Sequence, residues 1–378
     1  MSKSTRLKPE FVQQAVQDRK WIDDDTGLEQ MSETLNACSV IGFDTEFVRD
    51  RTFFPKPGLL QVSDGHSIWL VDPIALADST HFRSWLADCL TNPAQAKILH
   101  SVGEDFEVLE LLSGVYPSPL FDTQIAAALL GFPLQMRYEA LAEALIDIQF
   151  AGGLARNNWC RRPLPAEWSE YAAHDVIALP AMQTHLTDQL EQIGRLQWHT
   201  EDCARSVQRA QTRPDPLLRI KAATRLDDPA LAKLSQLVKW REHQARQRDL
   251  PRSFVAKDRV LITLSKQRPE TMQQLEKIED MHKGFIRRYG TELLALIAED
   301  PIGFERPPEL RPLTTDQQNA IKATQKTIRT IAEQLNIEAP LLASRRDLTQ
   351  LILTGQSDWL NGWRGEVLDG ALDPVLTA

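Results

Sequence analysis

The sequence predicts an α/β domain built on a mixed sheet, followed by two small all-helical bundles. Short strand-like runs alternate with helical patterns up to about residue 210, and the strand-like runs stop after Thr212. Two proline-rich breaks, Arg213–Pro216 and Arg306–Pro312, then divide the helical part. Because 378 residues exceed what one compact core accommodates, two or three domains are expected.

The first strands are expected where β-branched and aromatic residues gather. They are Ser39–Phe47, Leu59–Ser63 and Ser67–Val71, and the Asp-Gly-His triplet at 64–66 is a hairpin turn signal. Further elements follow: a helix near Thr80–Leu90, a strand over Ala96–His100, a helix from about Val102 to Leu112, a helix after the N-cap residue Asp122, and a long helix from Glu167 that Pro180 ends or kinks. Hairpin-linked strands followed by strand–helix alternation predict a mixed sheet with helices packed on it.

The second half of the chain is expected to be helical throughout. Helices are predicted over Pro229–Gln247, Lys257–Gln267, Thr271–Glu279, Gly284–Glu299 and Thr315–Leu335. The predicted domain limits are an N-terminal extension (1–20), the mixed-sheet domain (21–210), a linker (211–222), a helical domain (223–302), a proline-rich linker (303–312) and a second helical domain (313–378).

Composition excludes several classes of protein. Hydrophobic residues make up 42% of the chain, which is too many for wholesale disorder. The four cysteines form no C-x-x-C pair, which argues against a zinc ribbon or a disulfide scaffold and fits a reducing compartment. The polar N-terminus lacks a secretory signal, and the longest apolar run, about Ile125 to Leu134, is shorter than the roughly 20 residues of a membrane helix. We therefore expect a cytoplasmic protein.

The net charge of −9 hides a division between the two halves. Residues 1–210 carry 17 basic and 29 acidic side chains, whereas residues 211–378 carry 26 and 23. Within Lys233–Arg288, 14 basic side chains face 7 acidic ones. This division suggests metal chemistry in the first half and a polyanionic partner for the second, although on charge alone a solvated helical surface is the better explanation.

Carboxylates occur in three places where burial is expected. Asp44 and Glu46 are two residues apart on a predicted strand and so point from one face, although D-x-E alone also describes a strand end that frays into a loop. Asp105 lies on the apolar stripe of the next helix, which a capping box at Ser101–Glu104 is expected to start. The helix dipole contributes only ~0.3–1 kcal/mol there, less than burial of an unpaired carboxylate costs.

The third place is the long helix from Glu167. Asp175 falls on its apolar face, and Tyr171 lies one turn earlier, so their side chains are neighbours. His174 projects roughly 100° away and is expected to be a surface or packing histidine. Tyr171 taken alone is an ordinary core residue.

Converging carboxylates need positive charge close by. Two of them repel by as much as ~4 kcal/mol at 4 Å and an effective dielectric of 20. Oxygen ligands without Cys or His at metal-ligand spacing favour Mg²⁺ or Mn²⁺ over zinc. Two such cations about 3.5–4 Å apart neutralise four carboxylates and suit phosphodiester hydrolysis.

Three segments of the sequence resemble the motifs of DEDD-type 3′→5′ exonucleases. Phe43–Phe47 (FDTEF) resembles the first motif, His100–Leu109 (HSVGEDFEVL) the second, and Tyr171–Asp175 the third in its Y-x-x-x-D form. The histidine branch has His where this chain has Glu170, so the resemblance is to the tyrosine branch. The surrounding segments FVRDRTFFPKPGLLQVSDG, LFDTQIAAALLG and RRPLPAEWSEYAAHDV are similar to the bacterial ribonuclease D family.

The second half resembles the same family. RQRDLPRSFVAKDRVLITLSKQRP is similar to an HRDC domain, and LNGWRGEVL matches the family's C-terminal segment. The resemblance implies an RNase H-like exonuclease domain followed by two HRDC-type bundles. The family usually has a lysine near Gly152 and an aspartate in place of Asn158, differences that bear on RNA contacts of that loop and not on the metal site.

The resemblance also implies roles for the acidic residues. Asp44 would bridge two divalent cations, Mg²⁺ or Mn²⁺, Glu46 and Asp175 would hold the nucleophile-side cation, and Asp105 would support the second, partly through water. Tyr171 would orient the attacking water. A monomer that trims 3′ ends of tRNA precursors and other structured RNA to 5′-mononucleotides is expected. Candidate phosphate contacts, which are otherwise solvated surface, are Lys239, Arg241, Arg246, Arg248, Arg252 and Lys257.

Two alternatives belong to other classes. The first is a DNA 3′→5′ exonuclease, because no motif here reveals contacts to the 2′-hydroxyl. No G-x-x-x-x-G-K-[ST] loop occurs, so a helicase motor is not expected. The second is a non-catalytic RNA-binding protein, which the presence of all four acids and the tyrosine disfavours.

Overall fold

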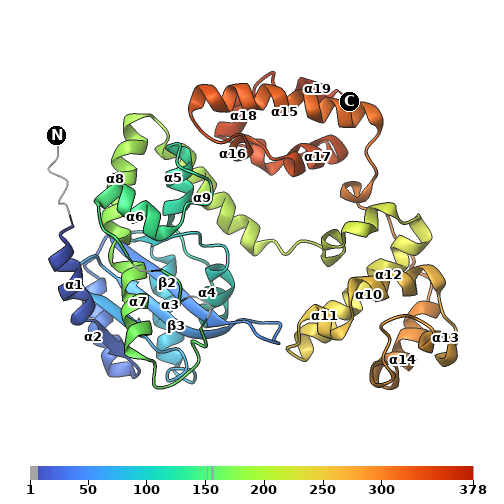
Figure 1. Cartoon of the computed structure of the whole chain (residues 1–378), viewed down its shortest axis with the longest axis horizontal. Helices are drawn as coiled ribbons and strands as arrows, with labels where there is room; N and C mark the ends of the chain where they lie inside the picture. Colours follow the sequence, from blue (N-terminus) through green and yellow to red (C-terminus); the bar gives the residue numbers. More distant parts are fainter. Residues whose placement is uncertain (1–6, 151, 155–156, 378) are drawn as a thin grey trace.

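The computed structural model describes residues 7–150, 152–154 and 157–377, and its first domain is organised around a six-stranded sheet (Figure 1). The strands are β1 (Lys20–Ile22), β2 (Val40–Val48), β3 (Lys56–Ser63), β4 (Ile68–Val71), β5 (Ala96–Leu99) and β6 (Leu120–Asp122). Their order in the sheet is β1-β4-β3-β2-β5-β6. β2, β3 and β4 form an antiparallel meander, and β1, β5 and β6 pair parallel with their neighbours. The predicted mixed sheet is confirmed.

The two faces of β2 meet different helices. Ile41 and Phe43 share a core with α2 (Asp25–Leu35), α3 (Thr80–Thr91) and α4 (Asp105–Ser113). The alternate residues, Asp44 and Glu46 among them, face α7 (Ala166–Ile177) and α8 (Leu179–Gln192) instead. The register of β2 against β3 shifts between Glu46 and Phe47, a bulge beside the two acids.

Close packing brings α7 and α8 onto β2. A Cβ on Gly42 would lie 3.1 Å from Leu179 Cβ and 3.3 Å from the Val176 carbonyl oxygen, so only glycine allows this approach without displacement. The predicted long helix ends as expected, because α7 stops at Ile177 and Pro180 occupies the first turn of α8. The break places the C-terminal turn of α7 over β2.

The predicted capping box at Ser101–Glu104 is wrong. Ser101 has a φ of 62°, the Glu104 side chain caps nothing, and α4 begins at Asp105. The Asp122 carboxylate instead accepts hydrogen bonds from the backbone N–H groups of Ser101 and Val102, each at 3.1 Å. Asp122 also caps α5 (Thr123–Leu129), as predicted. This shared acceptor makes Asp105 the first residue of its helix.

Helices from elsewhere in the chain complete the first domain. α1 (Pro9–Gln17) falls within the stretch expected as an extension, and β1 begins at the last residue of that stretch, yet α1 packs against α7 and buries Val12 and Val16. α6 (Tyr138–Ile146) packs against α8, and α9 (Leu196–Gln211) leads out of the domain.

The first helical bundle has a core of its own. Two 3₁₀ turns, η1 (Pro216–Arg219) and η2 (Lys221–Arg225), lead from α9 into it. Its helices are α10 (Asp228–Gln247), α11 (Arg252–Val255), α12 (Asp258–Gln267), α13 (Met272–Glu276) and α14 (Lys283–Ala298). Phe53, from the loop between β2 and β3, is buried in this core and links the two domains.

The second helical bundle shares one apolar cluster with the first domain. Its elements are η3 (Pro308–Leu310), α15 (Thr315–Leu335), α16 (Ala339–Leu342), α17 (Arg345–Thr354), η4 (Asp358–Leu360), α18 (Trp363–Val367) and α19 (Asp373–Leu376). Trp198 of α9 stacks on Trp363 with ring centroids 4.3 Å apart. Beside them Asp202 forms a buried ion pair with Arg364, with Arg364 Nη2 2.8 Å from Asp202 Oδ2. Within the described part of the chain, no helix has the length and apolar character that a membrane span requires.

We expect Asp202→Ala to destabilise the protein strongly. Asp202 also pairs with Arg205 and accepts a hydrogen bond from Trp363, so its removal leaves buried Arg364 without its partner. Loss of one partner of a buried pair costs about 3–5 kcal/mol. Thermal unfolding measures this loss, with exposed Asp369→Ala as the matched control. Equal melting temperatures for the two variants would contradict the assignment.

Candidate active site

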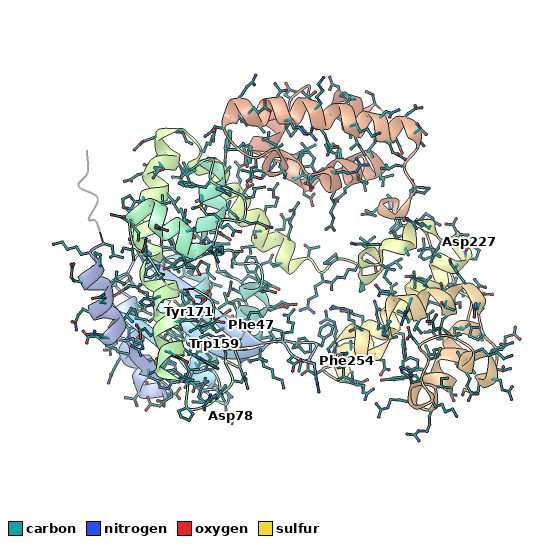
Figure 2. The ribbon with its side chains drawn as sticks, in the orientation of Figure 1. Phe47, Asp78, Trp159, Tyr171, Asp227 and Phe254 are labelled. Carbon is teal, nitrogen blue, oxygen red and sulfur yellow. The ribbon has the colours of Figure 1, made fainter. Side chains whose placement is uncertain are left out.

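The four predicted carboxylates and Tyr171 line one hollow of about 590 Å³. Asp44 and Glu46 come from β2, Asp105 from the start of α4, and Tyr171 and Asp175 from α7. Figure 2 shows Tyr171 on α7 close to the β2 residue Phe47, where these elements meet. Helices on opposite faces of the sheet thus bring their acids to the end of one strand.

Asp44, Glu46 and Asp175 form the tightest group. One carboxylate oxygen from each lies within 4.8 Å of the others, close enough for the three to ligate one cation. Asp105 lines the same hollow but is outside this group, and its Oδ1 accepts a hydrogen bond of 2.5 Å from Thr45 Oγ1. The structure therefore places three of the four acids together and holds the fourth beside them.

Burial and mutual repulsion act on all of these acids. Burial raises the pKa of Glu46 to about 9, and the charges of Asp175 and Asp105 add to this shift. Burial and the charges of Asp105, Asp175 and Glu46 raise the pKa of Asp44 well above its ordinary value. Burial raises the pKa of Asp105 to about 6, although the hydrogen bond from Thr45 acts to lower it. The like charges are forced together by the fold.

The donor set fits divalent cations. The described residues that line the hollow include no Lys or Arg, and burial lowers the pKa of His100, which leaves that ring neutral. The oxygens of aspartate and glutamate are the ligands that Mg²⁺ and Mn²⁺ prefer. Positive charge from such ions would relieve the repulsion that raises the pKa values of the acids.

Sequence reasoning missed two polar residues of the site. Gln61 of β3 stands opposite Asp44 in the sheet register, and its Nε2 donates to Asp44 Oδ2 at 3.1 Å. Gln61 is fully buried, and its Oε1 has no hydrogen-bond partner among the described residues. Glu139 of α6 and Glu104 are two more carboxylates on the hollow, and the charge of Glu139, after the larger effect of burial, raises the pKa of Asp175. The strand pairing signals Gln61, whereas nothing in the sequence signals Glu139.

The loop before α7 supports the site through packing. Trp159 is fully buried, and its ring centroid lies 6.2 Å from that of Tyr171. A Cβ on Gly152 would meet the Glu139 carboxylate, so a side chain at this position would require Glu139 to move. His174 packs its ring 5.3 Å from Phe150, which confirms the packing role expected for it.

Most of the candidate phosphate contacts form ion pairs or hydrogen bonds within the helical bundle, and Arg241 alone among the six is buried. Arg241 is buried, with Nη1 2.6 Å from Asp258 Oδ1, which leaves it no room for a phosphate. Arg246 and Arg252 both pair with Glu242, and Arg248 donates a hydrogen bond to the Tyr289 hydroxyl. Lys257 Nζ lies 3.4 Å from Asp280 Oδ1, and Lys239 is exposed.

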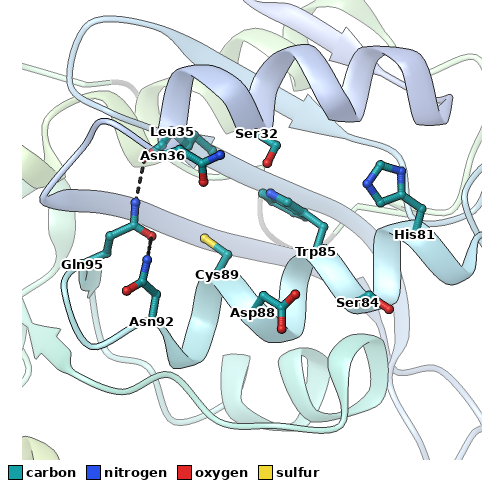
Figure 3. A pocket seen from close by; sticks show the side chains of 10 residues that line it. All are labelled: Ser32, Leu35, Asn36, His81, Ser84, Trp85, Asp88, Cys89, Asn92 and Gln95. Carbon is teal, nitrogen blue, oxygen red and sulfur yellow. Dashed lines mark hydrogen bonds between the residues drawn. The ribbon is translucent and has the colours of Figure 1, made fainter.

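A second hollow, of about 270 Å³ between α2 and α3, contrasts with the first (Figure 3). Asp88 is the one acid that lines it among the described residues, and burial raises the pKa of the Cys89 thiol to about 12. Gln95 Nε2 donates to the backbone oxygens of Leu35 and Cys38, at 2.7 and 3.0 Å, so its amide holds the fold together. This hollow lacks the paired acids of the site on β2.

Known proteins match both parts of the chain. A family model described as 3′-5′ exonuclease matches residues 19–191, and the HRDC domain model matches residues 230–297. The chain is 35% identical to ribonuclease D of Pseudomonas paraeruginosa, over 93% of this chain and 96% of that protein. It is 33% identical to ribonuclease D of Escherichia coli, over 94% and 97%. The crystal structure of Escherichia coli RNase D superposes with a TM-score of 0.85 at 31% identity, covering 95% of this chain and 98% of that one.

The fold and the acidic hollow thus define a 3′→5′ exonuclease with an RNase H-like catalytic domain and an HRDC domain. The near full-length matches specify the family further. The chain belongs to the ribonuclease D family and is a 3′→5′ exoribonuclease. The resemblance of the three motifs is confirmed, and a second HRDC-type bundle over 313–378 stays a prediction.

We expect Asp44→Asn to abolish nuclease activity and to stabilise the metal-free protein. The substitution removes one of the repelling charges and keeps the shape of the side chain. In EDTA, a gain of about 1 kcal/mol would raise the melting temperature by about 2–4 °C. Asp78→Asn, an exposed acid of the same domain, is the control and should melt like the unaltered protein. A melting temperature several degrees lower for Asp44→Asn would contradict the repulsion argument.

The stability of the metal-free protein should depend on pH through Glu46. Its pKa is about 9 in the folded protein and 4.5 ordinarily, so the folded state binds the extra proton and stability falls as pH rises between these values. We expect Glu46→Gln to have the same melting temperature as the unaltered protein near pH 4.5. Towards about pH 9, the melting temperature of the variant should exceed that of the unaltered protein by a growing amount. Thermal unfolding in EDTA across this range measures the difference. A difference that stays constant with pH would rule out Glu46 as its source.

Proposed function

We propose that Asp44, Glu46 and Asp175 hold one of two divalent cations, Mg²⁺ or Mn²⁺, and that Asp44 and Asp105 hold the other. The single observation that carries this proposal is the group of three carboxylate oxygens within 4.8 Å, with no basic side chain among the described lining residues. When bound, the two cations supply Lewis-acid stabilisation to the attacking and the leaving oxygen of a phosphodiester.

The protein's own residues orient these ligands. Gln61 donates to Asp44, and Thr45 donates to Asp105, so each carboxylate keeps one oxygen in a defined direction. Such outer hydrogen bonds fix the geometry of metal ligands. Burial and the charge of Asp175 raise the pKa of Tyr171 above its ordinary value, so the phenol stays protonated. Tyr171 therefore suits the orientation of a water molecule and not the removal of its proton.

The substrate we propose is the 3′ end of tRNA precursors and other structured RNA, shortened one 5′-mononucleotide at a time by a cytoplasmic monomer. The similar Escherichia coli enzyme is described as an exoribonuclease involved in structured RNA processing. Degradation of 5′-labelled RNA and of DNA with the same sequence, with Mg²⁺, with Mn²⁺ and in EDTA, tests this. Ladders of single-nucleotide steps on RNA, lost in EDTA, are expected. Equal or faster steps on DNA would favour the DNA exonuclease instead.

Tyr171→Phe should slow hydrolysis and leave metal binding intact. Loss of the hydroxyl misplaces the attacking water, and misplacement of this kind lowers the rate by up to about 100-fold. Calorimetric titration with Mn²⁺ should show unchanged affinity, since the carboxylates remain. Tyr116→Phe, whose hydroxyl contacts the Ala210 carbonyl away from the hollow, is the matched control. Weakened Mn²⁺ binding in Tyr171→Phe would assign the tyrosine to the metal site.

A further inference from the structure

The loop between β2 and β3 joins the exonuclease domain to the HRDC domain. The backbone N–H groups of Phe53 and Phe54 donate to Asp249 Oδ1, at 2.9 and 3.0 Å, and the Phe53 ring is buried in the HRDC core. Figure 1 shows this loop extending from the sheet to α11. Because β2 also carries Asp44 and Glu46, the loop forms a continuous path from the active site to the HRDC domain.

Arginines gather around this contact. The guanidinium carbons of Arg246 and Arg252 lie 4.8 and 4.5 Å from the centroid of the Phe53 ring. Both side chains pair with Glu242, and the charges of both act on Arg219 of η1. Arg219, Arg246 and Arg252, which we call the arginine cluster, thus face Glu242, and Asp249 is the second carboxylate at this contact. One positive charge remains in excess.

The exonuclease domain adds a fourth arginine. Arg49 lies just after β2. Burial lowers the pKa of its guanidinium, and the nearby charge of Arg252 lowers that pKa further. Arg49 itself pairs with Glu107, and Glu104, a lining residue of the active-site hollow, attracts it. Arg49 therefore lies between the hollow and the arginine cluster.

An exposed aromatic ring stands beside the arginine cluster. Phe254, two residues after Arg252 on α11, has 60% of its surface exposed, more than any other aromatic side chain in the described part of the protein. Figure 2 shows Phe254 on the side of the HRDC domain that is turned towards the exonuclease domain. An aromatic ring beside a positively charged surface is the arrangement with which proteins bind single-stranded nucleic acid, because every base can stack on it.

We propose that Arg49, the arginine cluster and Phe254 bind a single-stranded segment of the RNA substrate upstream of its 3′ end. The arginines receive phosphates, and Phe254 stacks on a base. This inference rests on the proposed function and deepens it, because it locates part of the substrate on this chain. Seven residues separate Glu46 from Phe53, so the path is at most about 23 Å long. That distance corresponds to about seven stacked nucleotides.

Substrate length therefore distinguishes this binding site from the active site. An RNA of about 20 nucleotides reaches both, whereas one of about two nucleotides occupies the active site alone. With Mg²⁺ present, Phe254→Ala should raise KM for the long RNA about fivefold or more and leave kcat unchanged, the effect of one lost stacking contact. Both constants should be unchanged on the short RNA.

Three further variants distinguish base stacking on Phe254 from the effect of side-chain size and from a loss of folding. Phe254→Trp should restore the KM for the long RNA, and Phe254→Leu, which keeps apolar bulk without a ring, should behave like Phe254→Ala. Ile302→Ala, which truncates a fully exposed apolar side chain elsewhere, should change nothing. An unchanged KM in Phe254→Ala, an equal change on the short RNA, or a Trp variant as weak as Ala would overturn the stacking role.

The phosphate contacts are tested by the salt dependence of binding. The exposed Arg219 is changed to Gln, and binding of a fluorescent RNA of about 20 nucleotides is followed by anisotropy in EDTA. The slope of log affinity against log salt should decrease by about 0.7, the value for one phosphate contact on a single strand. Arg288→Gln, an exposed arginine of α14, should keep the original slope. Equal slopes for the two variants would exclude Arg219 from the binding site.

Failure of this inference and failure of the proposed function give different results. If the unaltered enzyme releases no mononucleotides from either RNA, the proposed function is wrong. If it degrades both RNAs and the Phe254 and Arg219 variants match their controls, the active site stands and the upstream binding site is wrong.

Discussion

Repulsion among buried carboxylates is the constraint on which the rest of this structure depends. Asp44, Glu46 and Asp175 bring oxygens within 4.8 Å of one another, and burial raises the pKa of each. Carboxylates in water would separate, so packing elsewhere must hold them together. Divalent cations bound there would relieve this unfavourable charge.

The fold maintains this arrangement through the packing of its backbone. Because Gly42 has no side chain, the junction of α7 and α8 packs closely on β2. The helix break before Pro180 places Asp175 over the same strand. On the opposite face, Asp122 binds the backbone before α4, so that Asp105 begins its helix at the end of β2. Backbone geometry thus brings the acids together, and the side chains of Gln61 and Thr45 orient Asp44 and Asp105.

The helical parts are attached to the exonuclease domain in two different ways. The C-terminal bundle shares a core with it, and the buried pair of Asp202 and Arg364 lies within that contact. The HRDC domain keeps a separate core and meets the exonuclease domain at Phe53, where arginines surround the ring. A small aromatic contact on the loop that follows the strand of Asp44 and Glu46 therefore places the HRDC domain relative to the acidic hollow.

The sequence alone determined the chemistry of the protein. The periodicity placed Asp105 and Asp175 on apolar faces, and the spacing of Asp44 and Glu46 put both on one side of a strand. These are local properties, and the three motifs that carry them also identify the family. Tertiary structure decided what depends on contacts between distant segments: the start of α4 at Asp105, the pairing of Gln61 with Asp44, the approach of Glu139, and the burial of Arg241. A charge count could not separate Arg241 from its exposed neighbours, because burial arises only when the bundle closes around it.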